Sequence, residues 1–311
     1  MSYKPFVPNK KGVFDLKNIN LREIVPYIDW TFFFTAWRLT GKFDGIADAA
    51  HCEKCKITWM QKFSIENRAK AEEALQLYSD ASEMLLDLVG EVSINANFGI
   101  FSGYAINDDI YIVSKNESII IPTLRQQHKS SDGYCYSLAD FLAPKDDYVG
   151  AFVTTVIGGD EIAEKYEKEN DIYRSILAKT LCDRIAEASA EWLHAKVRKE
   201  YWGYSSDENL SIKEMIKGKY SGIRPAIGYP SLPDQSIIFS LVNLLKFQTI
   251  GVQVTENGAM YPNASVCGLY FSHPHSKYFM VGKIDQIQLE DYSRRRGKTV
   301  EEMKKWLIAN I

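Results

Sequence analysis

Cysteine and long apolar runs are both scarce in this chain of 311 residues. The five cysteines, Cys52, Cys55, Cys135, Cys182 and Cys267, are an odd number spread over a large chain. This pattern predicts reduced thiols and excludes the disulfide framework of a small secreted domain. The least charged long stretch, residues 257–276, is interrupted by prolines, and the N terminus lacks the apolar core of a signal peptide. The sequence therefore predicts a cytoplasmic protein without a membrane span.

An excess of either charge is also missing. The 37 Lys and Arg residues nearly balance the 40 Asp and Glu residues, which gives a formal net charge of −3. A general nucleic-acid-binding protein normally has a basic excess, so that class is excluded. The chain also has no G-x-G-x-x-G after a strand, no P-loop and no G-x-S-x-G. A Rossmann dinucleotide site and the glycine loop of the usual methyltransferases are therefore unsupported.

Cys52 and Cys55 form a C-x-x-C motif. A structural zinc site needs two further ligands, and the sequence has no second C-x-x-C and only an awkwardly spaced neighbour, His51. Two interpretations stay open for the pair. They are a metal or redox site, or ordinary thiols near the start of a helix.

The stretch Tyr220–Gln235 is rich in residues that fix the backbone, with three of the ten prolines and two glycines. Each proline fixes its own φ and pushes the preceding residue towards extended geometry, so the stretch is predicted to be a rigid loop. Such a loop loses little entropy when a ligand binds. Arg224 offers a fork of donors for a carboxylate or phosphate, and Tyr229 offers a ring with a hydroxyl at its tip. The loop is therefore a candidate binding wall, or a structural crossover with Arg224 in a surface salt bridge.

The rest of the chain combines helical and strand patterns without regular alternation. Residues 1–20 are polar and contain two prolines, which predicts an extended arm or linker before a domain over residues 21–311. Spacing of apolar residues predicts helices over 67–89, 160–201 and 237–247, and a helix ending at Gly41. The helix over 160–201 is either continuous or broken near Asn170-Asp171. It predicts strands over 94–123 with a turn near Asn116, and over 147–159, 265–274 and 277–284. Capping boxes predict short helices after Ser211 and Thr299. This succession favours an α+β fold with a largely antiparallel sheet.

Asp29 lies within an aromatic-rich apolar run, residues 21–43. A carboxylate there is costly unless a cation or several donors meet it. Its position before Trp30 and Thr31 also suits a helix N-cap. The two interpretations are compatible.

A polar stripe runs along the predicted helix 160–201 at Asp183, Glu187, Glu191 and His194. Spacings of four, four and three place these side chains on one face. Glu191 and His194 spell the Glu-x-x-His of di-iron bundles, but that site needs a second copy, which the chain lacks. The stripe is therefore interpreted as a solvated or salt-bridged face.

Several blocks of sequence carry a family resemblance. They are YIDWTFFFTAW (27–37), GYAINDDIYIV (103–113), LRQQ (124–127), LADFLAP (138–144), DYVGAF (147–152), LCDRIAEASAEWLHAKVRKEYWGY (181–204), GIRPAIGYPSLPD (222–234) and ASVCGLYFSHPHSKYF (264–279). In this order they resemble the C-terminal activation domain of cobalamin-dependent methionine synthase. The resemblance covers nearly the whole chain after residue 20.

The resemblance implies a single C-shaped α+β domain around a twisted antiparallel sheet, unlike Rossmann methyltransferases. It also implies reductive reactivation. The domain binds S-adenosylmethionine and presents its methyl group to reduced cobalamin on a partner module, with flavodoxin or a similar protein as electron donor. Carried over by motif, the ligand contacts are Asp29, Arg224 and the pair Tyr278-Phe279. We assign Arg224 to the ligand carboxylate and Asp29 to its ammonium.

Further assignments depend on the same resemblance. Backbone around Ala226 serves the adenine, Tyr229 lies near the corrin, and Glu187 supports the site from the long helix. The family's RPAPGYP is RPAIGYP here, so Ile227 replaces a proline. Phe279 stands where a second tyrosine is more common. Neither departure removes charge complementarity.

Other functions and arrangements stay open. The chain could be a non-catalytic module that senses S-adenosylmethionine or docks on the cobalamin module, or a reactivator of another corrinoid protein. Its length leaves no room for the other methionine synthase modules, which predicts either a fragment or a free-standing chain that acts in trans. The run Arg294-Arg295-Arg296 is either a docking patch for an acidic flavodoxin or a solvated helix end.

Overall fold

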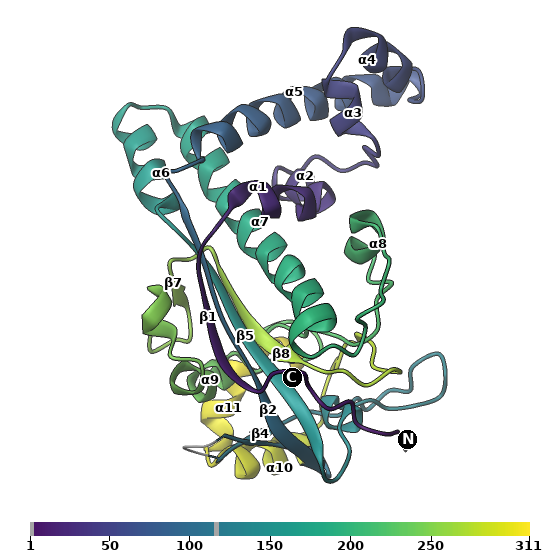
Figure 1. The fold of residues 1–311 in the computed structure, drawn as a ribbon, viewed down its shortest axis with the longest axis vertical. Helices are drawn as coiled ribbons and strands as arrows, with labels where there is room; N and C mark the ends of the chain where they lie inside the picture. The colour runs from purple at the N-terminus through teal and green to yellow at the C-terminus, as the bar shows by residue number, and fades with distance from the viewer. Residues whose placement is uncertain (1–2, 115–117) are drawn as a thin grey trace.

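A six-stranded antiparallel sheet forms the centre of the structure, a computed structural model that describes residues 3–114 and 118–311 (Figure 1). The strands are β1 Gly12–Ile19, β2 Ser93–Ile106, β3 Asp109–Val113, β4 Ser118–Pro122, β5 Asp147–Ile157 and β8 Ser265–Tyr270. Their order is β4-β3-β2-β5-β8, and β1 also pairs with β2. Each of these pairings is antiparallel, which confirms the predicted fold class. Strands β6 Gln253–Val254 and β7 Met260–Tyr261 form a separate small hairpin.

Helices cover both faces of the sheet. The helices are α1 Leu21–Ile24, α2 Trp30–Ala36, α3 Ile46–Ala50, α4 Glu53–Met60, α5 Ile65–Asp87, α6 Gly159–Lys168, α7 Ile172–Lys196, α8 Ile212–Ile216, α9 Ile238–Leu244, α10 Gln286–Arg296 and α11 Val300–Trp306. Side chains alternate along the strands, so Phe152 and Tyr270 face a core shared with α7. Val153 and Leu269 face a second core shared with α9, α10 and α11. In Figure 1 the long helix α7 runs beside the strands, and it packs on β5 and β8.

Most of the predicted elements are confirmed, since their signals are local. The apolar spacing over 67–89 corresponds to α5, and buried residues such as Ala74 and Leu77 occur on its inner side. The predicted long helix divides into α6 and α7 at Asn170, which has a positive φ of 60°. Asp171 then caps α7 by accepting a hydrogen bond from Arg174 N at 3.0 Å. The capping boxes at Ser211 and Thr299 are both present. The turn predicted near Asn116 lies outside the described residues.

Half of the predicted N-terminal arm belongs to the sheet. Residues 12–19 form β1, which pairs with β2 from Gly12 opposite Ile100 to Ile19 opposite Ile94. The preceding residues also contact the domain, because Asn9 N donates to Trp202 O at 3.2 Å and Trp202 Nε1 donates to Phe6 O at 3.0 Å. Of the two alternatives, an extended arm or a linker, the segment is an extended arm that pairs with the sheet. Its polar composition reflects a strand at the edge of the sheet, where alternate side chains face solvent.

Two further elements differ from the prediction. The helix expected to end at Gly41 is α2, which ends at Ala36. Residues 277–284 form no strand. Their backbone pairs with loops instead, because Val281 N donates to Pro230 O at 2.9 Å and Ile284 N donates to Asn310 O at 2.8 Å. Apolar alternation alone does not reveal whether a neighbouring strand exists.

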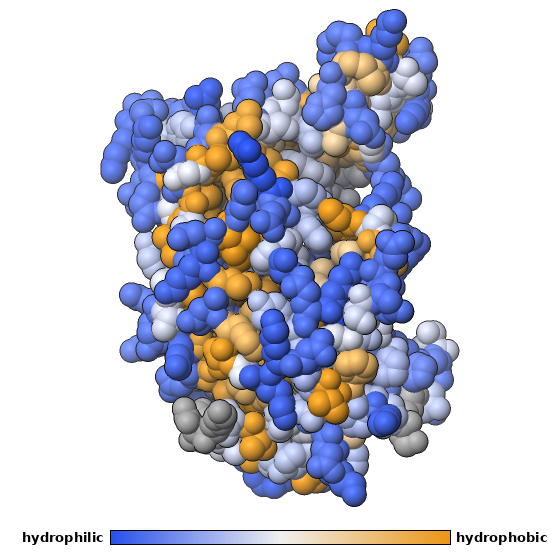
Figure 2. All heavy atoms as spheres, in the orientation of Figure 1, coloured by the Kyte–Doolittle hydropathy of each residue, from blue (hydrophilic) through white to orange (hydrophobic). Residues whose placement is uncertain are grey.

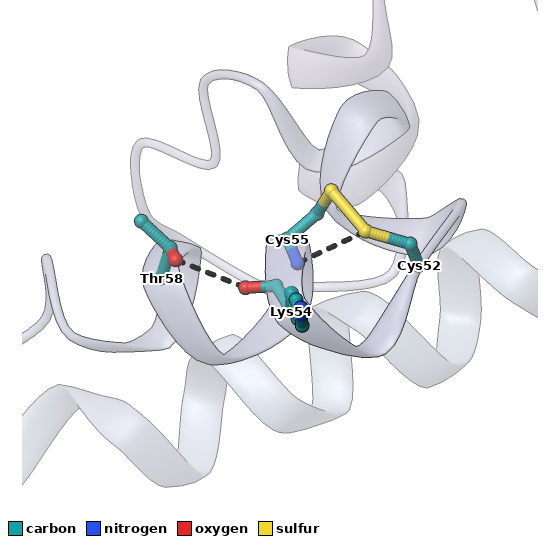
Figure 3. The surroundings of a disulfide bond; sticks show 4 residues. All are labelled: Cys52, Lys54, Cys55 and Thr58. Atoms are coloured by element: carbon teal, nitrogen blue, oxygen red, sulfur yellow. Dashed lines mark hydrogen bonds between the residues drawn. A yellow bond between two sulfur atoms is a disulfide. The ribbon is translucent and has the colours of Figure 1, made fainter.

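Cys52 and Cys55 are joined by a disulfide at the start of α4 (Figure 3). The prediction of reduced thiols was wrong for this pair, whereas Cys135, Cys182 and Cys267 are free. Cys52 is the N-cap residue, and its Sγ accepts a hydrogen bond from Cys55 N at 3.1 Å. This cap places the two side chains within the same turn, with the Cα atoms 5.2 Å apart.

This pairing predicts a thiol count. Unfolded without reductant, the chain should expose three reactive thiols to a chromogenic disulfide reagent, and five after reduction, because only the Cys52–Cys55 pair is oxidised. A Cys52→Ser variant should give four thiols under both conditions. Five thiols in the unreduced wild type would contradict the pairing.

The far end of the helical layer is polar. Helices α3 and α4 project beyond the sheet at the end of α5 (Figure 1), and hydrophilic residues cover most of that end on the face shown in Figure 2. Within residues 3–114 and 118–311, no helix combines the length and apolar character that crossing a membrane requires.

Candidate functional site

A buried ion pair joins the proline-rich loop to helix α7. The Arg224 guanidinium donates from Nη2 and Nε to Glu191 Oε2, at 2.9 and 3.3 Å. The Arg224 side chain is 16% exposed and that of Glu191 8%. Burial disfavours the charge, but the Glu191 carboxylate together with Tyr278, Tyr220 and Glu187 outweighs burial and raises the pKa of Arg224 well above its ordinary value. The predicted loop therefore presents a fixed cation, and the surface salt bridge considered for Arg224 is in fact a buried one.

Two tyrosines form hydrogen bonds with this ion pair. Tyr278 Oη accepts a hydrogen bond from Arg224 N at 3.0 Å and lies 3.3 Å from Tyr220 Oη. Tyr220 Oη in turn donates to Glu191 Oε2 at 3.4 Å. Burial and the neighbouring Tyr278 and Glu191 raise the pKa of Tyr220, so its hydroxyl stays protonated and able to donate. The loop, α7 and the segment after β8 therefore meet at one polar cluster.

A second layer of polar groups lies behind this cluster. Arg198, fully buried, forms a bidentate pair with Glu208, with Nε–Oε2 at 2.9 Å and Nη2–Oε1 at 2.7 Å. Its guanidinium carbon lies 4.2 Å from the centre of the Tyr220 ring. His194 packs against Tyr220 at 4.9 Å between ring centres. Burial, with Arg198 and Arg224 nearby, lowers the pKa of His194 well below its ordinary value, so the ring is neutral at pH 7.

Strand β8 holds the binding loop through backbone contacts. Ala226 forms a bridge with Gly268, Ile227 N donates to Cys267 O at 2.9 Å, and Leu269 N donates to Pro225 O at 3.0 Å. A Cβ at Gly268 would lie 2.3 Å from Pro225 O and 2.8 Å from Ala226 Cα. Gly268 is therefore the residue that permits the loop to approach the sheet.

This close approach makes Gly268→Ala informative. The added methyl group meets backbone on the loop side, which cannot move without displacing Arg224, so we expect a loss of stability of about 1–3 kcal/mol and weaker ligand binding. Urea unfolding and calorimetric ligand titration measure the two effects. Cys267→Ala, on the opposite face of the same strand, should leave ligand affinity unchanged. Unchanged affinity in Gly268→Ala would contradict this role.

Tyr229 and Glu187 form a second contact between the loop and α7. The Tyr229 hydroxyl donates to Glu187 Oε1, one helical turn from Glu191. Burial and the Glu187 carboxylate raise the pKa of Tyr229. The Tyr229 side chain is nevertheless half exposed. The pair therefore lies at the outer edge of the candidate site.

Asp29 is confirmed as a helix cap. Its Oδ1 accepts a hydrogen bond from Thr31 N at 2.9 Å at the start of α2. Helix α2 and the preceding turn, residues 25–27, pack against α7. The contacts described for Asp29 are local, and none joins it to Arg224. Its role as a ligand contact stays a prediction.

The Tyr278-Phe279 pair is divided between surface and core. Tyr278 is half exposed beside Arg224, whereas Phe279 is buried against Tyr136 and Phe141. Ser231 fixes the Phe279 backbone, because its hydroxyl accepts from Phe279 N at 3.2 Å and donates to Phe279 O. The hydroxyl that a tyrosine would carry at position 279 would therefore lie in an apolar core. Its contact with ligand stays a prediction.

The polar stripe and the arginine run each had two interpretations from the sequence. For the stripe, the salt-bridged alternative is confirmed at Glu191, which pairs with Arg224. The solvated alternative is wrong for Glu191 and His194, because both are buried. No group of three or more His, Cys, Asp or Glu side chains suited to a metal occurs in the described parts of the chain. The arginine run is not a solvated helix end throughout, since Arg295 pairs with Asp109 at 2.6 Å and Arg296 with Asp234 at 3.1 Å. Its role as a docking patch for a flavodoxin stays a prediction. Of the run, Arg294 alone is largely exposed, at 75%.

Sequence reasoning missed Glu191 and Tyr220 as members of the site. Glu191 was visible on the polar stripe, one turn after Glu187, but its partner Arg224 is 33 residues away. The spacing of polar residues along α7 could have indicated Glu191. The sequence does not show, however, which element packs on that face of the helix.

Two cavities lie elsewhere. One of about 510 Å³ is bordered by Lys11, Phe101 and Leu244, and one of about 880 Å³ lies beside Cys52 between α4 and α5. No residue of the polar cluster lines either of them. The Arg224–Glu191 cluster therefore lies apart from both cavities.

Comparison with known proteins identifies the family of the chain. The family described as vitamin B12 dependent methionine synthase, activation domain, matches residues 20–297. A crystal structure of the MetH reactivation domain bound to AdoHcy is 38% identical, with a TM-score of 0.87 over 99% of this chain and 93% of that one. Both matches extend over the loop, α7 and β8. The chain belongs to the activation-domain family of vitamin B12-dependent methionine synthases.

Proposed function

We propose that this activation domain binds S-adenosylmethionine at the loop 222–229 and presents its methyl group to cobalamin on a partner module. The observation that carries the proposal is the buried Arg224–Glu191 pair with Tyr278 beside it. A fixed guanidinium next to a carboxylate complements a ligand that carries both a carboxylate and an ammonium. The related reactivation domain with AdoHcy bound supports the same ligand class.

The contacts follow from the position of each group. Arg224 would bind the ligand carboxylate through the part of its fork that Glu191 does not occupy. The backbone at Ala226, held on β8 by Gly268, would meet the adenine. Tyr278 and Asp29 would contact the amino-acid end, with Phe279 supporting Tyr278 from the core.

We assign the contact between Tyr229 and Glu187 to the part of the site that meets the cobalamin module. Tyr229 and Glu187 lie at the exposed edge of the site, so we place them on the side that faces the corrin. Their hydrogen bond would keep the Tyr229 ring against α7 until the cobalamin module docks.

The chemistry requires little of this chain beyond positioning. When bound, S-adenosylmethionine supplies a methyl group on a sulfonium, and reduced cobalamin on the partner supplies the nucleophile. The residues of this chain would orient the ligand by its charged end and restrict water at the buried cluster. A flavodoxin-like protein is the proposed electron donor. In this proposal the chain is the methyltransferase component of a reactivation reaction and needs a cobalamin module to complete it.

Calorimetric titration tests the ligand. S-adenosylmethionine and S-adenosylhomocysteine should both bind the purified chain saturably at one site, because they share the amino-acid end and the adenosine. Adenosine alone, without the charged end, should bind much more weakly. A folded chain that binds neither charged ligand would contradict the proposal.

A further inference from the structure

The two oxygens of Glu191 have different surroundings. Oε2 accepts from Arg224 Nη2 at 2.9 Å, from Arg224 Nε at 3.3 Å and from Tyr220 Oη at 3.4 Å. Oε1 is buried and has no hydrogen-bond partner among the described residues. The side chain is only 8% exposed, so bulk water does not solvate this oxygen freely. A buried carboxylate oxygen without a donor is costly, and native proteins normally supply one.

The charges around Glu191 indicate what kind of donor fits. Arg198 is matched by Glu208 and Arg224 by Glu191, while His194 is neutral. These four charged side chains therefore balance one another, with the Glu187 carboxylate at the outer edge of the site as a further negative charge near Arg224. A zwitterion keeps the balance. In an α-amino acid the ammonium and carboxylate are attached to one carbon, so a carboxylate held by Arg224 brings the ammonium close to Glu191.

We propose that Glu191 is a ligand-binding residue whose Oε1 accepts the α-ammonium group of the bound S-adenosylmethionine. Oε2 meanwhile keeps the Arg224 fork oriented towards the ligand carboxylate. The inference rests on the proposed function and names a different residue for the ammonium than Asp29. Asp29 already uses Oδ1 to cap α2, whereas Glu191 has a buried oxygen with no partner.

The test compares ligands with and without the amino group. The probes are S-adenosylhomocysteine, its deamino analogue and 5′-methylthioadenosine, which lacks the whole amino-acid end. Each is titrated calorimetrically into wild type, Glu191→Gln and Asp29→Asn. Glu191→Gln retains an acceptor oxygen for Arg224 and loses the charge. Glu200→Gln is the matched control, because Glu200 is 57% exposed and pairs with Lys196 one turn away.

The proposal makes a selective prediction. Glu191→Gln should lower the affinity for S-adenosylhomocysteine about tenfold or more, since it loses a charged hydrogen bond. The deamino analogue and 5′-methylthioadenosine should change much less. Asp29→Asn, at the amino-acid end of the ligand, should weaken the binding of S-adenosylhomocysteine and of the deamino analogue by a similar factor. Glu200→Gln should leave both affinities unchanged. The Asp29→Asn result can be measured even if Glu191→Gln fails to fold, and an amino-dependent loss there would contradict the inference.

Other results would overturn the inference in distinguishable ways. An amino-dependent loss in Asp29→Asn alone would assign the ammonium to Asp29. Equal losses for S-adenosylhomocysteine and the deamino analogue in Glu191→Gln would mean that Glu191 only orients Arg224. If the wild type binds neither ligand, the proposed function itself fails, and the inference fails with it.

Discussion

Replacing Arg224 with alanine should weaken the binding of S-adenosylmethionine by about 10- to 100-fold, because a hydrogen-bonded charge pair with the ligand is lost. The same change leaves the Glu191 carboxylate buried without its cation, so the free energy of unfolding should also fall, by about 3–5 kcal/mol. Calorimetric titration measures the first effect and urea unfolding the second.

A second variant separates the two effects. Arg224→Lys keeps the charge for Glu191 but loses the planar fork, so it should remain folded and still bind about tenfold more weakly. Arg294→Ala is the matched control, because that arginine is 75% exposed and contacts only Asp291 among the described residues. Wild-type affinity in Arg224→Lys and Arg224→Ala would remove Arg224 from the ligand site.

A loss of stability of similar size is expected at Arg198. Arg198→Met should lower the free energy of unfolding by about 3–5 kcal/mol, because Glu208 would remain buried without a partner. Urea unfolding followed by tryptophan fluorescence measures this, since Trp202 lies one turn away and is fully buried.

The double variant Arg198→Met/Glu208→Leu tests the physical reason. With both charges removed, no buried charge is left unpaired, so its loss of stability should be smaller than that of Arg198→Met alone. Glu200→Ala, which removes one member of an exposed pair on the same segment, should change stability by no more than about 0.5 kcal/mol. A double variant that is less stable than Arg198→Met would contradict the account.

Elements with a local signal could be predicted from the sequence. The three-and-four spacing of α5, the capping boxes at Ser211 and Thr299, and the Asp29 cap each depend on residues within one or two turns. The loop around Arg224 could be predicted for the same reason, because proline restricts its own backbone and that of its neighbour. These features need no knowledge of the tertiary fold.

Features that depend on distant partners could not be predicted. The alternation in residues 277–284 resembles a strand, but the segment pairs with loops at Pro230 and Asn310. Arg295 and Arg296 form a basic run in sequence, yet Asp109 and Asp234 neutralise them from far along the chain. Residues 12–19 become a strand only because β2 is long enough to offer them an edge.

The candidate site was predictable in part. The motif around Arg224 pointed to a cation on a rigid loop, and the structure places that cation in a buried cluster with Tyr278. Glu191 was recognised only as one carboxylate in a stripe. Its importance comes from the packing of the loop on α7, which no local pattern encodes.

The measurement that tests the central claim most directly is methyl transfer to cobalamin. The purified chain is mixed with a cobalamin-loaded methionine synthase module, a low-potential reductant and S-adenosylmethionine labelled in its methyl group. The account predicts labelled methylcobalamin only when all four components are present, and about 10- to 100-fold slower labelling at subsaturating ligand with Arg224→Ala. Saturable binding of S-adenosylmethionine without any label on cobalamin would contradict it.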